Sequence, residues 1–208
     1  MVDILLFIHV LAGIVALITG LMIFLLKKGT VLHVNIGTIY AYMMYLTFIT
    51  GTVVSIIHSN LFLLTVGFFS FYMVLTGVRY NRIRSVAMVK GLDKFITVFF
   101  AICFLFMFSL GVFAFMKGVN GLGIILTVFT AIGVSLLRHD FSFFLRKRQP
   151  KEHLFWKREH IGRMIGSYIA ATTAFAVNNI HIEPDFITWL LPTALGIPLI
   201  IVYTKKHV

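Results

Sequence analysis

The residues of this chain that are most able to carry chemistry are its eight histidines. A neutral imidazole is the commonest biological metal ligand and also an axial ligand of haem iron. Histidine equally suits a membrane interface, because its ring body is apolar and its edge is polar. We expect this interfacial role for His139 and His153 in a basic loop and for His207 near the C-terminus. The other five lie in or beside long apolar runs.

His9 differs from the others because it lies well inside an apolar run. An ionisable residue within a membrane span is costly and by default indicates a function, although a hydrogen bond to a neighbouring helix also explains it. The remaining four are at the ends of two runs, as the pairs His33 and His58, and His160 and His181. At 1.5 Å per residue these pairs are about 37 Å and about 32 Å apart, so one site cannot use both ends of one helix.

Composition defines the elements that must position these histidines. The chain is 60% hydrophobic and 12% charged, with a mean hydropathy of +1.00, and several runs reach the roughly 20 residues that span a bilayer. Because lipid offers the backbone no hydrogen bonds, these runs must be helices. We predict a single all-α domain, residues 1–208, that forms a polytopic membrane bundle. Its seven transmembrane helices are expected at about 4–26, 34–57, 61–78, 95–116, 122–137, 159–182 and 186–203.

The sixth predicted helix, residues 159–182, is expected at the centre of the bundle. It is rich in small residues, which allow helix backbones to approach closely. Gly166 and Ala170, four positions apart on one face, are therefore expected to touch another helix. The fourth helix is rich in phenylalanine and is expected to face lipid. Pro192 and Pro198 interrupt the seventh helix, for which we expect a kinked span and leave its continuity open.

Lysine and arginine set the expected orientation. Apart from Lys117, they lie in alternate connections, at the start of the sixth helix and at the C-terminus, whereas Asp3, Glu183 and Asp185 lie at the opposite ends. By the positive-inside rule the N-terminus is outside and the C-terminus inside. The net charge of +11 is thus explained by topology and by anionic lipid headgroups rather than by nucleic acid.

The orientation gathers three histidines at the outer face, provided that the first, second and sixth helices are neighbours. Three imidazoles and a carboxylate would suit zinc or another divalent metal with an open position for water, and two of the imidazoles would suit haem. The proposed outer ligands are His9, His58 and His181, with Glu183 or Asp185 and with Asp3 near.

At the inner face, His33 and His160 form a pair that could hold haem b between facing helices. Three nearby cations could pair with the haem propionates: Arg163, Lys27 and Lys28. For Arg163 a contact with lipid phosphate is an equal alternative.

Two tyrosines accompany this inner pair. Tyr40 and Tyr168 lie about two turns further into the bilayer than His33 and His160, respectively. They are either interface aromatics or hydrogen-bond donors to a bound cofactor.

Four stretches of the sequence resemble an uncharacterised family of bacterial multi-pass membrane proteins of unknown function. They are HVLAGIVALITG, KKGTVLHVNIGTIYAYMM, NLFLLTVGFFSFYMVLTGVRY and EHIGRMIGSYIAATTAFAVNN. The residues of the recurrent pattern are His9, Lys28, Gly29, His33, Gly37, Tyr40, His160, Arg163, Met164, Ser167 and Tyr168. The resemblance covers most of the chain and implies a protein of the bacterial inner membrane, but no known activity.

A looser resemblance is to cytochrome b561 and related transmembrane di-haem proteins, through histidines near both faces of a helical bundle. It implies haem b and electron transfer across the membrane, with a possible redox partner. The leading hypothesis is accordingly a haem-b electron carrier. The alternatives are a zinc-type membrane enzyme that uses the outer cluster, and a transporter or non-catalytic membrane partner. Whether the chain is an enzyme is left open.

Overall fold

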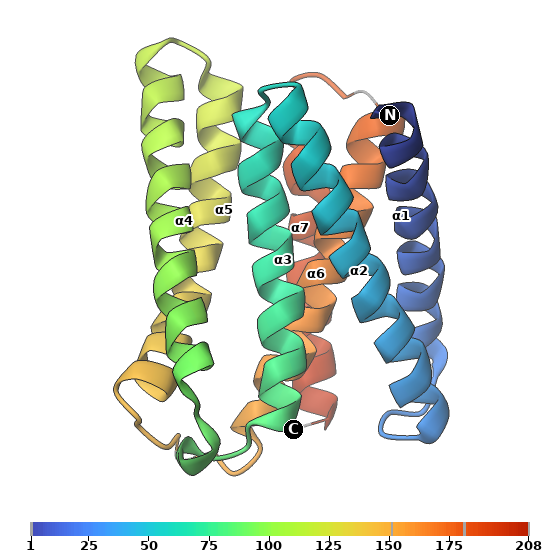
Figure 1. The fold of residues 1–208 in the computed structure, drawn as a ribbon, viewed down its shortest axis with the longest axis vertical. Coiled ribbons are helices and arrows are strands. Elements are labelled where there is room, and N and C mark those ends of the chain that lie inside the picture. The colour runs from blue at the N-terminus through green and yellow to red at the C-terminus, as the bar shows by residue number, and fades with distance from the viewer. Residues whose placement is uncertain (1, 151, 181, 208) are drawn as a thin grey trace.

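The computed structural model describes residues 2–150, 152–180 and 182–207. Their regular structure consists of helices that run along one long axis (Figure 1). The long helices are α1 (Val2–Leu25), α2 (Val31–Ile57), α3 (Leu61–Arg82), α4 (Gly91–Met116), α5 (Asn120–Asp140), α6 (Phe155–Asn179) and α7 (Phe186–His207). A 3-10 turn, Val86–Met88, precedes α4, and a π-helical turn, Phe141–Leu145, extends α5.

Six of the helices are long and apolar enough to cross a membrane: α1, α2, α3, α4, α5 with its π-helical extension, and α7. The all-helical membrane architecture expected from composition is therefore confirmed in this form. Helix α6 does not belong to this set. It carries charged residues in its first turns and polar residues further along, among them Arg163, Ser167 and Tyr168. Helix α7 continues through Pro192 and Pro198 as one helix.

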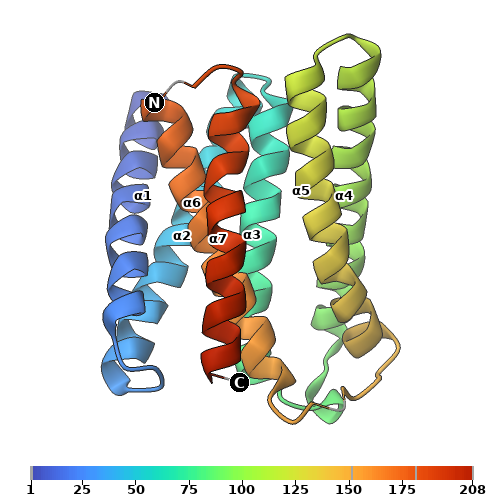
Figure 2. The same cartoon turned by 180° about the vertical axis from the view of Figure 1, so that it is seen from behind.

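Helix α6 lies in the middle of the bundle, where it packs on α3 and α7 and contacts α1 (Figure 2). Its small residues permit this position. A Cβ atom added at Gly166 would lie 2.8 Å from Sδ of Met73 on α3, and Ala170 packs against the apolar core. The predicted helix contact at Gly166 and Ala170 is thus confirmed.

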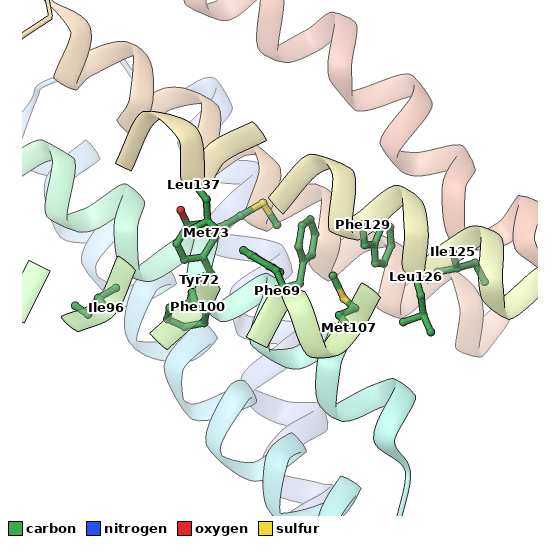
Figure 3. Packing of buried hydrophobic residues seen from close by; sticks show 11 residues of the cluster. Phe69, Tyr72, Met73, Ile96, Phe100, Met107, Ile125, Leu126, Phe129 and Leu137 are labelled. Atoms are coloured by element: carbon green, nitrogen blue, oxygen red, sulfur yellow. The ribbon is translucent and has the colours of Figure 1, made fainter. Parts of the chain in front are cut away.

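The largest apolar core lies between α3, α4 and α5 (Figure 3). The Phe69 and Phe129 rings stack with centroids 5.0 Å apart, and Phe100 and Phe104 of α4 are buried. The prediction that the phenylalanines of α4 face lipid is therefore wrong for these two, although Phe113 is exposed. One face of the helix builds the core and the other faces outward.

The bundle has two chemically different ends (Figures 1 and 2). We call one the basic end; it contains the connections 26–30, 83–90 and 146–154, which carry most of the loop lysines and arginines, and the C-terminal turn of α7. We call the other the acidic end; it contains Asp3, Glu183 and Asp185. Helix α2 begins at the basic end, where the hydroxyl of Thr30 accepts a hydrogen bond from the backbone N–H of His33 at 3.3 Å, satisfying one of the N–H groups that every helix start leaves free.

Candidate cofactor-binding site

A pocket of about 560 Å³ opens at the basic end between α2 on one side and α3 and α6 on the other. Tyr40 of α2 lines the pocket, and its hydroxyl lies 2.8 Å from the hydroxyl of Ser167 on α6. Toward the basic end, α2 leans away from α3 (Figure 1). We call this pocket the wedge, after the divergence of α2 from α3 toward the charged end of the bundle.

His160 lines the wedge from α6 and is held in one orientation. Its Nδ1 lies 2.8 Å from the carbonyl oxygen of Gly77 on α3. Because a carbonyl can only accept, Nδ1 carries the proton and donates, and in a neutral imidazole Nε2 keeps the lone pair. The close contact depends on Gly77, where a Cβ atom would lie 2.9 Å from Sδ of Met164.

His33 lines the same wedge from α2. Its Nδ1 is buried and, within the described part of the chain, has no hydrogen-bond partner. A buried polar atom without a partner is costly and needs an explanation. The two imidazoles are close enough to interact electrostatically, so the structure brings the inner pair predicted from sequence into one pocket.

The two tyrosines predicted beside this pair also line the wedge. Tyr40 is only 1% exposed, so an interfacial role does not apply to it. The ring of Tyr168 lies 6.5 Å from that of Tyr40 and packs against α1, where a side chain at Gly20 would collide with it. Both tyrosines thus build the apolar wall of the pocket.

Four cations line the wedge: Lys28, Arg79, Arg82 and Lys157. Two are already engaged. Arg79 pairs with Asp93, and the ammonium of Lys28 donates to the carbonyls of Ile23 and Phe24 at the end of α1. Partial burial lowers the pKa of Lys28. Lys27, predicted to lie at this site, is not among the lining residues.

Arg163 lies outside the wedge, in a buried polar network between α3, α5 and α6. Its guanidinium is 0% exposed. It donates to Asp140 at 2.5 Å and 3.2 Å and to the hydroxyl of Thr76 at 2.8 Å. Further donations reach Glu159 at 3.2 Å and 3.3 Å and the Leu136 carbonyl at 3.2 Å. With its donors filled, Arg163 has the role of a structural cation rather than the predicted one of a partner for haem propionates or lipid phosphate.

The network continues around Asp140. Tyr72 and Tyr80 donate their hydroxyls to its two carboxylate oxygens at 2.5 Å and 2.8 Å. On the side of Glu159 away from Arg163, His139 Nδ1 lies 2.9 Å from the Glu159 carboxylate. His139 is therefore paired with a carboxylate rather than placed freely in a headgroup region.

The outer histidines are placed differently from one another. His9 Nδ1 lies 3.0 Å from the carbonyl oxygen of Thr47 on α2, which confirms the hydrogen bond to a neighbouring helix. His58 is exposed at the end of α2, and it follows Gly51, the residue beside the His9 ring, by seven positions, or about 11 Å. His181 lies outside the described residues.

No group of three His, Cys, Asp or Glu side chains that could hold a metal is found among the described residues. Glu183 and Asp185, the acidic residues proposed for the outer site, are exposed. The predicted neighbourhood of α1 with α2 and α6 is confirmed. The register along α2 nevertheless separates His9 from His58.

Sequence reasoning missed Asp140 and most of the wedge lining. Asp140 was assigned to a loop because the predicted helix ended at residue 137, whereas α5 continues to Asp140 and the π-helical turn follows it. The phenylalanines after Asp140 were the available signal, since they extend the apolar pattern. Arg82 and Lys157 lie just outside the predicted helices 61–78 and 159–182, in the basic connections. The pocket that they line depends on the tilt of α2, which no sequence pattern indicates.

No protein-family model, no curated protein and no solved structure matches this chain.

Proposed function

We propose that this protein binds one haem b in the wedge, where His33 and His160 would hold it, and serves as a membrane electron carrier. The observation that carries the proposal is the placement of the two imidazoles on α2 and α6, which line the same pocket from different sides. Bound haem would supply one-electron redox chemistry, and imidazole is one of its usual protein ligands.

The residues of the wedge fit this group. His160 donates through Nδ1 to a backbone carbonyl, the arrangement that orients a ligating histidine and raises its basicity. His33 has a buried ring nitrogen whose missing hydrogen bond a small rotation or a ligand could satisfy. Tyr40, Tyr168 and Met164 supply the apolar surface that an amphipathic macrocycle needs.

For the membrane arrangement we propose seven crossings: the six helices that are apolar enough to span a membrane, and α6 in addition. The charges of α6 support this, because Arg163 and Glu159 are buried against other helices, as polar groups within a membrane must be. The basic end would face the cytoplasm of a bacterial inner membrane, with the N-terminus outside. Electron exchange would then occur at the cytoplasmic face with a redox partner.

The zinc-enzyme alternative stays a prediction without support from the described residues, since His9 hydrogen-bonds to α2 and His58 lies about two turns beyond. Electron transfer through a second haem at the acidic end likewise lacks a pair of facing imidazoles among these residues. We therefore restrict the proposal to a single haem at the basic end.

The test is a haem titration of the purified full-length protein, followed by its Soret band, with metal analysis of the same sample. Wild type should bind one equivalent. His33→Ala and His160→Ala should each weaken binding at least about tenfold, since a metal–ligand bond is lost. His153→Ala, an exposed change outside the wedge, is the matched control. Binding that is absent in wild type, or equal in all four proteins, would refute the proposal.

A further inference from the structure

At the basic end, every carboxylate side chain of the described residues is already paired, so none remains to neutralise the cations at the mouth of the wedge. The chain has seven acidic residues, and three of them, Asp3, Glu183 and Asp185, lie at the acidic end. The other four are at the basic end, and each already has a cationic partner. The pairs are Asp93 with Arg79, Asp140 with Arg163, Glu152 with Arg158, and Glu159 with Arg163 and His139.

Arg82 and Lys157 consequently face the wedge with no carboxylate to neutralise them. Neither has an ion pair or side-chain hydrogen bond within the described residues, and no acidic residue lines the pocket there. Arg82 comes from the last turn of α3 and Lys157 from the first turns of α6. The two cations therefore reach the mouth from neighbouring helices.

The pocket behind them is apolar and reaches the lateral surface of the bundle. Tyr42 and Tyr45 of α2 line it together with Leu75 and Val78 of α3. Tyr42 is 62% exposed, so the wedge communicates with the surroundings of the helices between α2 and α3. Arg82 and Tyr45 line the same pocket, so the opening between α2 and α3 and the basic mouth belong to one cavity.

We propose that Arg82 and Lys157 bind the charged end of an amphipathic anion whose apolar body lies in the wedge between α2 and α6. A carboxylate or phosphate would supply the missing countercharge and accept charge-assisted hydrogen bonds from both cations. The inference rests on the pocket of the proposed function and specifies it: for haem, the anionic groups are the propionates. The same chemistry is offered by the phosphate of a membrane lipid.

The test uses the full chain in phosphatidylcholine nanodiscs. The chain has two tryptophans, and Trp156 lines the wedge, so Trp189→Phe leaves Trp156 as the only tryptophan reporter of binding. Three probes are titrated: haemin, haemin dimethyl ester, which keeps iron and macrocycle but lacks the charges, and phosphatidic acid. The variant is Arg82→Gln with Lys157→Gln. Arg148→Gln with Lys206→Gln, which removes the same charge from exposed residues at the same end, is the matched control.

If haem is the ligand, wild type binds haemin more tightly than its dimethyl ester. The double variant then loses about tenfold or more in haemin affinity, whereas its affinity for the ester is unchanged. If haemin does not bind but phosphatidic acid quenches Trp156 in wild type and control and not in the double variant, the haem proposal fails and the anion site stands, with a lipid as its source. Equal binding of either anion by double variant and control, or binding of neither anion by wild type, overturns the inference.

Discussion

At the scale of single residues, two groups of cations at the basic end differ in whether carboxylates of the chain neutralise them. Arg163 is enclosed by two carboxylates, one hydroxyl oxygen and one carbonyl oxygen of its own chain, whereas Arg82 and Lys157 have no such partners among the described residues. The sequence indicated that Arg163 matters, because it follows His160 by three positions. It could not indicate Asp140, which is 23 residues away and comes near only through the tertiary arrangement of α3, α5 and α6 around Arg163. A long-range pair of this kind leaves no local spacing to read.

Replacing Arg163 by methionine should destabilise the protein strongly. The change leaves Asp140 as a buried charge without a cation, which costs about 3–5 kcal/mol. Reversible unfolding in sodium dodecyl sulfate measures the loss of unfolding free energy. Adding Asp140→Asn to the same chain should recover part of it, because the uncompensated charge is removed. Lys206→Met, an exposed control, should change stability by less than about 0.5 kcal/mol. A similar effect for Arg163→Met and Lys206→Met would show that the network does not stabilise the fold.

At the scale of elements, α6 carries polar residues of the site and also packs closely against another helix. Its basic-end half carries the charges and His160, and its middle carries the small residues that fit against α3. Close packing at Gly77 and Gly166 is what brings His160 within 2.8 Å of the Gly77 carbonyl. The pattern of small residues predicted the helix contact at Gly166 and Ala170, because close approach depends on residue size. It did not predict the contact of His160 with Gly77. The tilt of α2 that opens the wedge has no comparable pattern and followed only from the structure.

Replacing Gly166 by leucine should lower the melting temperature in detergent. The new side chain would meet Met73, and overpacking of this kind costs about 1–3 kcal/mol. Gly13→Leu on α1 is the matched control, because a Cβ atom there has nothing within 4 Å. Met73→Ala in the Gly166→Leu background should restore part of the loss. If both glycine variants melt at the same temperature, the face of Gly166 is not tightly packed.

At the scale of the whole molecule, composition alone was sufficient for the class of fold. Long apolar runs can satisfy their backbone in lipid only as helices, and the segments between Val2 and His207 have the predicted order. The helix ends were less predictable, because charged last turns such as that of α3, with Arg79 and Arg82, continue a helix beyond its apolar run. The same separation of charge between the two ends supports the proposed orientation.

The orientation predicts where reporters fused to the chain will be active. A fluorescent protein fused after Val208 should fluoresce and a periplasmic phosphatase fused there should be silent, because the basic end would be cytoplasmic. The phosphatase inserted after Gly118, in the turn between α4 and α5 at the acidic end, should be active. The reverse pattern at the two positions would invert the orientation.

Electron paramagnetic resonance of the oxidised, haem-loaded protein distinguishes whether His33 and His160 both ligate one haem. Two imidazole ligands should give a low-spin ferric signal in wild type and in His153→Ala. His33→Ala and His160→Ala should each convert the signal to high spin, and added imidazole should restore low spin by filling the vacated position. A high-spin wild type, or a low-spin signal that persists in both histidine variants, would contradict the account.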